Sequence, residues 1–349
     1  MNLDPDFIEA QQGHAEINFR IWSRSYNTIR YTLDALEAAE ATIGTILNAD
    51  PSNPRAIGLQ IRIEVERLNR DQALTTARAA VFNQPDEPWL RNVLGLALLV
   101  SGEYEDAKAE FAAYEVLSPR LNSEDKKDLA WQYLRLGNAN KALSLLISIP
   151  KEEAEVELQN RLMADAHALN GDIEIAKTYM AKFLKDTLWV NLMWQKPWFD
   201  IYSDTSIYED YAAAITKAGL PEWPYNFDKG REGDRLLHNE LVELFSDNYR
   251  EAHTTGPFGA PYREVRKADG TISMHFAWMN GIPITGKWYI KEDQFCHRLP
   301  AIHMGREECN NVYIDREKST ESVKHIIVKH IINVYSIGLF KSEFRRVEE

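Results

Sequence analysis

The sequence is poor in cysteine and has no long hydrophobic run. Only two of its 349 residues are cysteines, too few for a disulfide framework and without the four-ligand spacing of a structural zinc site. No segment reaches the roughly 20 apolar residues that a membrane-spanning helix needs. The first residues also lack the charged-then-apolar pattern of a secretory signal. We therefore expect a cytoplasmic protein without membrane insertion.

Common catalytic motifs are also missing. The sequence has no GxGxxG, GxxxxGK[ST], GxSxG or HExxH pattern, and the segment GPFGAP at 256–261 is typical of a proline-fixed loop, not of a phosphate cradle. His253 or His275 could be paired with an acidic residue, but such pairs occur in most chains of this length and do not indicate acid/base catalysis. We expect no enzyme activity, no cofactor and no metal.

Negative charge is in excess and unevenly distributed. The formal net charge is −13; residues 1–223 contain 34 acidic and 22 basic residues, and residues 224–349 contain 19 and 18. An acidic surface repels phosphate backbones, so nucleic-acid binding is disfavoured. The difference in composition predicts two domains, 1–223 and 224–349.

A repeat of about 34 residues runs through the acidic part. The stretch GEYEDAKAEFAAYEVLSP begins at Gly102 and contains Ala107, and alanines also lie 34 and 68 residues before Ala107. The pair of small residues returns twice more, as Gly137 with Ala142 and as Gly171 with Ala176. Two helices cross closely only where neither backbone carries bulk, which explains why small residues recur. The sequence therefore predicts stacked helical hairpins.

This period resembles the tetratricopeptide repeat, a helix-turn-helix unit that stacks into a solenoid. The copy starting near Pro88 matches best, through Leu94, Gly95, Ala107, Phe111 and Pro119. Further copies start near Ser123, Glu157 and, more weakly, Pro54. Their matching residues are Leu129, Ala130, Tyr133 and Ala142; Met163, Ala164, Ala176 and Phe183; and Ala73, Ala80 and Pro85. The resemblance implies an all-α superhelical solenoid, and we expect a final capping helix at 207–218.

The resemblance also implies a concave groove, lined by the first helix of each repeat, that can hold an extended segment or a helix of a partner. The side chains expected to project into it are mostly basic or aromatic: Arg55, Arg62, Trp89, Asn92, Lys127, Trp131, Arg135 and Arg161. Such a groove would suit an acidic or carboxylate-bearing peptide, with Trp131 as an apolar anchor. The alternative is that the aromatic residues pack between helices and the basic ones are simply solvated. We expect a non-catalytic scaffold or adaptor for another protein.

After residue 224 the pattern changes. One helix is expected at about 234–246, followed by short runs rich in Val, Ile, Tyr, Phe and Trp that are separated by turn formers. These runs predict a small antiparallel sheet or barrel. The whole chain is therefore expected to be of the α+β class.

A second resemblance concerns the order of the whole chain. Repeats, a helix ending in KAGLPEWP, and then GKWYIKEDQFC and SIGLFKSEF resemble the C-terminal region of bacterial class III adenylate/guanylate cyclase-associated repeat proteins. The matching residues in the β part are Trp288, Cys296, Cys309, Gly338 and Phe340. Those proteins carry a catalytic domain ahead of the repeats, for which this chain has no room. The resemblance therefore implies the architecture and not cyclase activity.

The two cysteines allow three interpretations. With His297 and His303 they contain potential metal ligands, but the spacing is not that of a zinc finger or ribbon. They could instead form a disulfide in an oxidising compartment, or stay reduced and pack as small apolar groups. A cytoplasmic location favours the reduced form.

An alternative function places the activity in the β part. It would bind a small molecule or catalyse a reaction, with the repeats as a delivery module. This function needs an internal cavity, for which we expect a lining of Trp278, Trp288, His275 and Tyr313. A deep cavity of this kind would distinguish it from the scaffold function.

Overall fold

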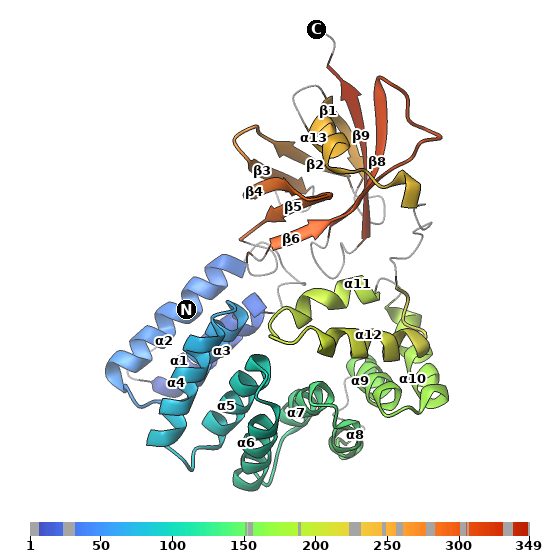
Figure 1. Ribbon diagram of the computed structural model, residues 1–349. Coiled ribbons are helices and arrows are strands. Elements are labelled where there is room, and N and C mark those ends of the chain that lie inside the picture. The colour runs from blue at the N-terminus through green and yellow to red at the C-terminus, as the bar shows by residue number, and fades with distance from the viewer. Residues whose placement is uncertain are drawn as a thin grey trace. The chain divides into compact units, whose positions relative to one another are not determined.

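The structure is a computed structural model (Figure 1). It describes residues 7–23, 32–150, 152, 156–187, 190–222, 232–245, 249–255, 261–276, 283–300, 305, 307–330 and 338–347. The chain divides into two compact units, Met1–Phe19 with Leu36–Glu222 and Arg20–Ala35 with Trp223–Glu349. The first unit is helical and the second contains the β-strands, so the chain belongs to the α+β class, as predicted. In the described part, no helix has the length and apolar character needed to cross a membrane.

The first unit consists of paired helices that begin at regular intervals. The pairs are α1 (Ile8–Ser23) and α2 (Thr32–Ala49), α3 (Pro54–Glu66) and α4 (Arg70–Asn83), α5 (Pro88–Ser101) and α6 (Tyr104–Leu117), α7 (Ser123–Arg135) and α8 (Ala139–Ile147), and α9 (Val156–Leu169) and α10 (Ile173–Asp186). The first helices of the last four pairs begin within one residue of the predicted starts. Figure 1 shows these pairs stacked in a curved row.

Small residues lie where neighbouring helices meet. One alanine sits at the repeat position of each second helix, and all five are fully buried: Ala39, Ala73, Ala107, Ala142 and Ala176. A Cβ atom on Gly95 of α5 would come within 2.6 Å of the Phe111 ring of α6. Phe111 in turn contacts Tyr133 of α7 edge-on, with the ring centres 6.1 Å apart. The predicted packing roles of these residues are confirmed.

The turns between paired helices share one backbone conformation. Gly102, Gly137 and Gly171 have φ angles of 87°, 69° and 89°, in the left-handed region that glycine adopts without steric cost. In the turn between α3 and α4, the same position is occupied by Leu68, with φ 64°. The next residue, Asn69, donates its backbone N–H to the carbonyl of Glu64, as the corresponding residues do in the other turns. The pair α3 and α4 therefore keeps the turn geometry without the glycine.

Three short elements follow the repeats: α11 (Leu192–Gln195), the 3-10 helix η3 (Lys196–Phe199) and α12 (Ser206–Lys217). The capping helix predicted at 207–218 corresponds to α12, displaced by one residue. In Figure 1 these elements lie along the inner side of the curved row, and α12 packs against α9.

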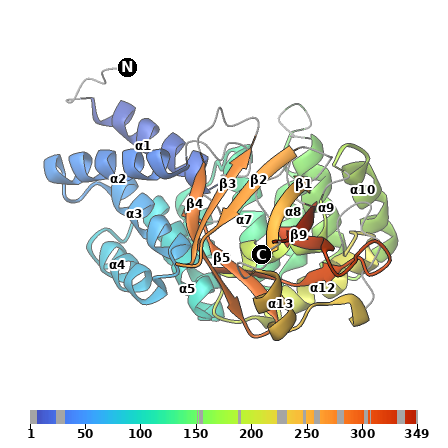
Figure 2. The same cartoon turned by 90° about the horizontal axis from the view of Figure 1, so that it is seen from above.

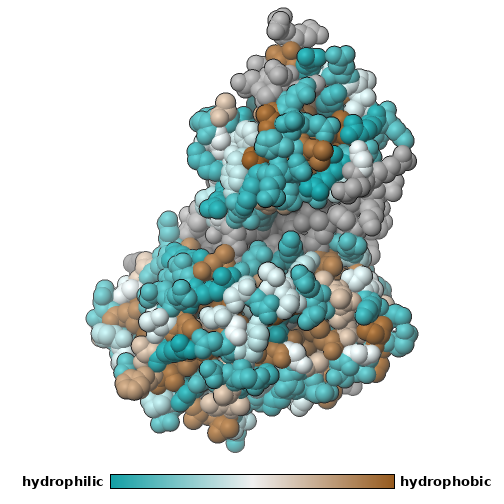
Figure 3. All heavy atoms as spheres, in the orientation of Figure 1, coloured by the Kyte–Doolittle hydropathy of each residue, from teal (hydrophilic) through white to brown (hydrophobic). Residues whose placement is uncertain are grey.

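Apolar side chains are also exposed on the helical unit. The largest exposures are those of Phe82 at 86%, Val116 at 79% and Ile147 at 69%. On the face visible in Figure 3, apolar residues are interspersed with polar ones.

The second unit is an antiparallel barrel. Its strands are β1 (Tyr249–Thr255), β2 (Pro261–Arg266), β3 (Thr271–Phe276), β4 (Ile284–Lys291), β5 (Gln294–Arg298), β6 (Glu307–Asn310), β7 (Val312–Ile314), β8 (Val323–His330) and β9 (Gly338–Arg346). They pair in the order β6-β5-β4-β3-β2-β1-β9-β8-β7, part of which is visible in Figure 2. Only Asn311 separates β6 from β7, so both edges of the sheet belong to one bent strand and the sheet closes on itself.

A short helix completes the barrel core. Helix α13 (His238–Leu244) is shorter than the helix predicted at 234–246, and it buries Leu241 and Leu244. These side chains join a core that includes Met274, Phe295 and Phe344.

The two cysteines form a disulfide, so the expected reduced pair is wrong. Cys296 on β5 lies directly opposite Cys309 on β6, with their Cα atoms 4.0 Å apart. Residues directly opposite each other on neighbouring antiparallel strands can be joined by a disulfide, because their side chains face the same way. Neither sulfur is then available as a metal ligand, and His303 lies outside the described residues.

Candidate functional site

The residues predicted to line the groove fall into two groups. Arg55 and Arg62 on α3 lie with Trp89 and the half-buried Asn92 on α5. Lys127, Trp131 and Arg135 on α7 lie with Arg161 on α9. The two groups have different surroundings, which we describe in turn.

The second group is covered by a segment of the chain itself. Residues 195–211, here called the docked segment, run from the end of α11 through η3 into α12. The Arg135 side chain is 5% exposed. Its guanidinium carbon lies 3.7 Å from the ring centre of Trp131, 4.0 Å from that of Phe199 and 4.6 Å from that of Tyr211. Burial lowers the Arg135 pKa, and the guanidinium does not face an open groove.

Arg161 and Asp165 of α9 extend this buried cluster. Arg161 donates hydrogen bonds to Gln195 and, at 3.2 Å, to the hydroxyl of Tyr211. Its Nε lies 3.6 Å from a carboxylate oxygen of Asp165, whose side chain is fully buried. Burial raises the Asp165 pKa, an effect opposed by Arg161 and Arg135. The Tyr211 pKa is raised to about 12, first by burial and then by the Asp165 charge.

The irregular part of the docked segment is held through its backbone. Arg70, at the start of α4, donates to the carbonyl oxygens of Ile201 at 2.6 Å, Asp200 at 2.7 Å and Tyr202 at 3.2 Å. A charged donor shared among three carbonyl groups fixes this turn without reading its side chains. Arg70 was not among the predicted groove residues.

Contacts with α5 and α6 continue along the same segment. The backbone N–H of Ser203 donates to the carbonyl of Val100 at 2.8 Å, and the Tyr104 hydroxyl donates to Asp204 at 2.8 Å. Burial, then the hydrogen bond to Asp204, raises the Tyr104 pKa to about 12. The inner side of the repeats thus holds an irregular stretch and a helix of the same chain.

Lys127 is also engaged within the chain. Its side chain is 3% exposed and its ammonium group pairs with Glu124 one turn earlier on α7. Together with Arg135 and Arg161, it accounts for three of the five basic residues expected to face a partner. All three contact groups of their own chain.

The first group lies at an open end of the inner face. A pocket of about 300 Å³ is lined there by residues of α1, α3 and α5: Glu9, Gln12, Gly13, Glu16, Arg55, Leu59 and Trp89. The guanidinium carbon of Arg55 lies 4.8 Å from the ring centre of Trp89. That of Arg62 lies 4.8 Å from the Phe19 ring and 5.7 Å from Trp89. The structure therefore places Arg55 and Arg62 against the Trp89 ring, and of these two arginines only Arg55 lines the pocket.

Gly58 makes this arrangement possible. A Cβ atom at position 58 would come within 2.0 Å of the Trp89 indole nitrogen, so the nitrogen edge of the indole occupies the place of a side chain on α3. The sequence offered a signal for this contact, because Gly58 is the only glycine within α3.

Acidic groups surround the same end of the inner face. Burial raises the Asp125 pKa, and the charges of Asp128 and Glu16 raise it further, while Arg55 opposes them.

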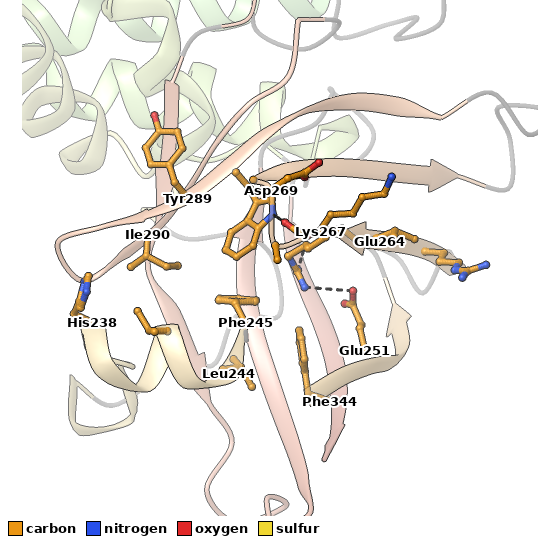
Figure 4. Close-up of a pocket in the computed structure, with 17 residues that line it drawn as sticks. His238, Leu244, Phe245, Glu251, Glu264, Lys267, Asp269, Tyr289, Ile290 and Phe344 are labelled. Atoms are coloured by element: carbon orange, nitrogen blue, oxygen red, sulfur yellow. Dashed lines mark hydrogen bonds and ion pairs between the residues drawn. The ribbon is translucent and has the colours of Figure 1, made fainter. Parts of the chain in front are cut away.

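The barrel contains a larger pocket of about 1020 Å³ (Figure 4). It is lined by α13, by strands β1, β2, β4 and β9, and by the turn between β2 and β3. Of the four residues expected to line a cavity in the β part, Trp288 does so. Among the described residues that line this pocket, His275 and Tyr313 are absent, and Trp278 lies outside the described residues.

Comparisons with known proteins bear on the helical unit alone. No family model and no curated protein matches the chain, so its resemblance to cyclase-associated proteins stays a prediction.

Solved structures similar to this chain include three bacterial proteins. A thermophilic TPR protein from Thermus thermophilus is 20% identical, with 59% of this chain and 99% of that chain covered and a TM-score of 0.38. PilF of Pseudomonas aeruginosa is 18% identical, with 59% and 89% covered and a TM-score of 0.38. A tetratricopeptide repeat protein from Parabacteroides merdae is 15% identical, with 60% and 74% covered and a TM-score of 0.35. At these scores the likeness carries no conclusion about binding.

Proposed function

We propose that the helical unit is a non-catalytic interaction scaffold that binds a partner segment in the pocket beside Arg55 and Trp89. The observation that supports the proposal is the docked segment, because an irregular stretch and a helix of the same chain pack on this inner face. The docked segment leaves the pocket on α1, α3 and α5 unfilled. A partner segment would continue the same binding mode at that end.

The chemistry of the pocket specifies the segment. Trp89 and Leu59 offer an apolar surface, and Glu9 and Glu16 offer carboxylates. We propose a partner segment that presents an apolar side chain next to a basic one. The acidic partner expected from the sequence depended largely on Lys127, Arg135 and Arg161, which are engaged within the chain.

Quantitative affinity purification with the full chain as bait tests this proposal. The Glu9→Gln/Trp89→Ala variant should lose a specific partner at least tenfold, whereas Phe82→Ala should retain it. Phe82 is a suitable control because its side chain is 86% exposed on α4, away from the pocket lining. Each variant is first checked for native helix content. Retention of every partner by a folded Glu9→Gln/Trp89→Ala variant would contradict the proposal.

A further proposal concerns the division of the chain near residue 223. We propose that residues 1–223 and 224–349 form independent domains. The boundary between the two compact units at Glu222 and Trp223 supports this division, whereas the grouping of Arg20–Ala35 with the second unit does not. Limited proteolysis followed by mass spectrometry should give two protease-resistant fragments that meet near this point. Cleavage that begins inside the repeats would argue against it.

A further inference from the structure

The sheet of the barrel opens between β1 and β2. In the described part of the chain these two strands pair at two positions only, Thr254 with Tyr262 and Thr255 with Pro261. On their other sides, β2 pairs with β3 at five positions and β1 pairs with β9 at six. The edge of residues 263–266 that faces β1, here called the free edge, therefore has no strand paired with it among the described residues.

The barrel pocket lies along this free edge. Successive side chains of a strand point to opposite faces of the sheet, so a pocket on one face meets every second residue. The pocket of about 1020 Å³ is lined instead by residues 263–267 without a gap. Its lining thus includes both faces of β2, as expected for a space that runs along the edge of the strand.

A buried charge cluster closes the opening on its inner side. Arg266 on β2 lies 3.6 Å from a carboxylate oxygen of Glu251 on β1, and it also pairs with Glu264 on its own strand (Figure 4). The Glu264 side chain is fully buried, and those of Glu251 and Arg266 are 8% exposed. These charges are engaged with one another and barely accessible to a ligand. They form the floor of the opening and link the two strands where the backbone pairing has ended.

Two exposed basic residues lie on the outer face of the same strand. Arg263 and Lys267 are four residues apart, in β2 and directly after it, so their side chains project from one face, opposite to the buried cluster. Asp269, the exposed acidic residue of the lining, accepts hydrogen bonds from the backbone and the side chain of Thr271 at 2.9 and 2.6 Å. A strand added beside β2 would place its outward side chains next to Arg263 and Lys267, where opposite charges stabilise a sheet.

Apolar side chains form another wall of the pocket. Phe245, Trp288 and Ile290 are partly buried against the barrel core, and Val242 of α13 is 49% exposed. The indole N–H of Trp288 donates to the carbonyl of Lys267 at 3.1 Å, which fixes the ring beside the turn between β2 and β3. The inward side chains of an added strand could pack on these residues.

We propose that the opening between β1 and β2 binds an extended peptide segment of a partner protein, which adds a strand to the free edge. An unpaired edge offers backbone N–H and C=O groups to such a segment. Main-chain hydrogen bonds then supply affinity, and alternate side chains supply specificity. Arg263 and Lys267 select acidic residues at every second position, and the apolar wall selects apolar residues between them. The site lies in the barrel and goes beyond the proposed scaffold function.

Three fluorescein-labelled peptides of eight residues test the proposal by fluorescence anisotropy with the full chain. The first alternates valine with glutamate, the second alternates valine with lysine, and the third is the first with N-methyl groups on alternate backbone nitrogens. The glutamate peptide should bind saturably and at least tenfold more tightly than either of the others. Its binding should also slow hydrogen exchange of the amides of residues 263–266, measured by mass spectrometry.

Three results would overturn the proposal. Equal binding of the N-methylated peptide would show that the backbone of the free edge is not used, as in a site for small molecules. Tightest binding of the lysine peptide would contradict the role of the two basic residues. Binding of none of the three peptides would leave the free edge without the proposed occupant.

Charge reversal then locates the site. Arg263→Glu/Lys267→Glu should reverse the preference, so that the lysine peptide binds at least tenfold more tightly than the glutamate peptide. Lys318→Glu/Arg345→Glu is the matched control, because it changes the net charge equally at two exposed residues outside the described lining of the pocket. This control should keep the original preference. If the first double variant does not fold, Lys267→Glu alone should reduce the preference at least threefold. An unchanged preference in the folded variant would overturn the proposal.

Discussion

Both units bury an arginine among aromatic rings and beside acidic groups. In the helical unit, Arg135 lies against Trp131, Phe199 and Tyr211. In the barrel, Arg266 lies against three phenylalanine rings, of which Phe245 is the nearest. The chemistry of the two surroundings is the same, but the space around them is not.

The helical unit fills the space around its arginine with its own docked segment, whereas the barrel leaves a pocket of about 1020 Å³ beside its arginine. A cluster of this composition is therefore not in itself a binding site. What distinguishes the two is whether another segment of the chain already occupies the position of a ligand. We expect the loss of a buried charge to cost more stability in the filled cluster around Arg135 than in the cluster around Arg266, which lies beside open space.

The largest expected effect compares Asp165→Asn with Glu251→Gln, which remove one buried carboxylate charge from each cluster. Asp165→Asn should lower the free energy of unfolding of the helical unit by about 3 kcal/mol or more, because Arg135 and Arg161 lose a buried counter-charge. Glu251→Gln should cost about 1 kcal/mol, since Glu264 still pairs with Arg266. Hydrogen exchange in urea, followed by mass spectrometry of peptides from each unit, measures both. Equal losses would remove the distinction between the two clusters.

The next largest effect is confined to the barrel. Cys296 and Cys309 close a loop with a sequence separation of 13, and replacing both by serine should lower the stability of the barrel by about 3 kcal/mol. The helical unit should unfold as before. Thiol titration of the denatured protein should find no free thiol without reductant and two with it. Two free thiols in the unreduced protein would show that the bond is absent.

A smaller effect separates the two units by pH. The hydrogen bond from Tyr289, then that from Lys291, lowers the Glu307 pKa from its ordinary 4.5 to about 2. An acid whose pKa is lowered by folding stabilises the protein above its unfolded pKa. The barrel should therefore lose this contribution as the pH falls from about 4.5 towards 2. In Tyr289→Phe, the urea midpoint of the barrel should fall less over this pH range than in the unchanged protein. The same pH profile in both proteins would argue against the role of the Tyr289–Glu307 hydrogen bond.

The smallest effect tests the turn between α3 and α4. Leu68 holds a positive φ where other repeats have glycine, so Leu68→Gly should raise the free energy of unfolding by up to about 1 kcal/mol. The reciprocal change, Gly137→Leu, should lower the free energy of unfolding by a similar amount. Only the backbone cost should act there, because nothing lies within 4 Å of a Cβ atom at that position. Urea denaturation of the helical unit measures both. If both variants changed the free energy of unfolding in the same direction, the positive φ angle could not be the cause.

The repeats could be predicted because their determinants are local. Close helix crossings need small residues at fixed intervals, and the buried positions of Ala107, Ala142 and Ala176 confirm the interval. The starts of the helices follow from the same spacing. The disulfide could not be predicted, for a different reason. Its formation depends on the register of β5 and β6, which the spacing of Cys296 and Cys309 alone does not determine.

The functional surroundings were harder to predict. An arginine at a repeat position that faces the groove looks the same in the sequence whether solvent or residues 195–211 cover it. The burial of Arg135 could therefore not be predicted. In β2, hydrophobic alternation would place Val265 inside, yet Glu264 is the buried neighbour, with 5% of its surface exposed. Ion pairing with Arg266 outweighs the apolar preference there. The aromatic Trp288 could be predicted because its size alone suggested a lining role.

The closure of the barrel by β1 and β9 sets the order in which the chain can fold. Tyr249 pairs with Arg346 across almost the whole β region, whereas every helical hairpin joins neighbours along the sequence. Local contacts form quickly and distant ones slowly, because a long loop must first be brought together. During synthesis the repeats can assemble before β9 has left the ribosome, and until then β1 exposes an unpaired edge. The late arrival of one strand makes the barrel the slow step and the point where a nascent chain is open to aggregation.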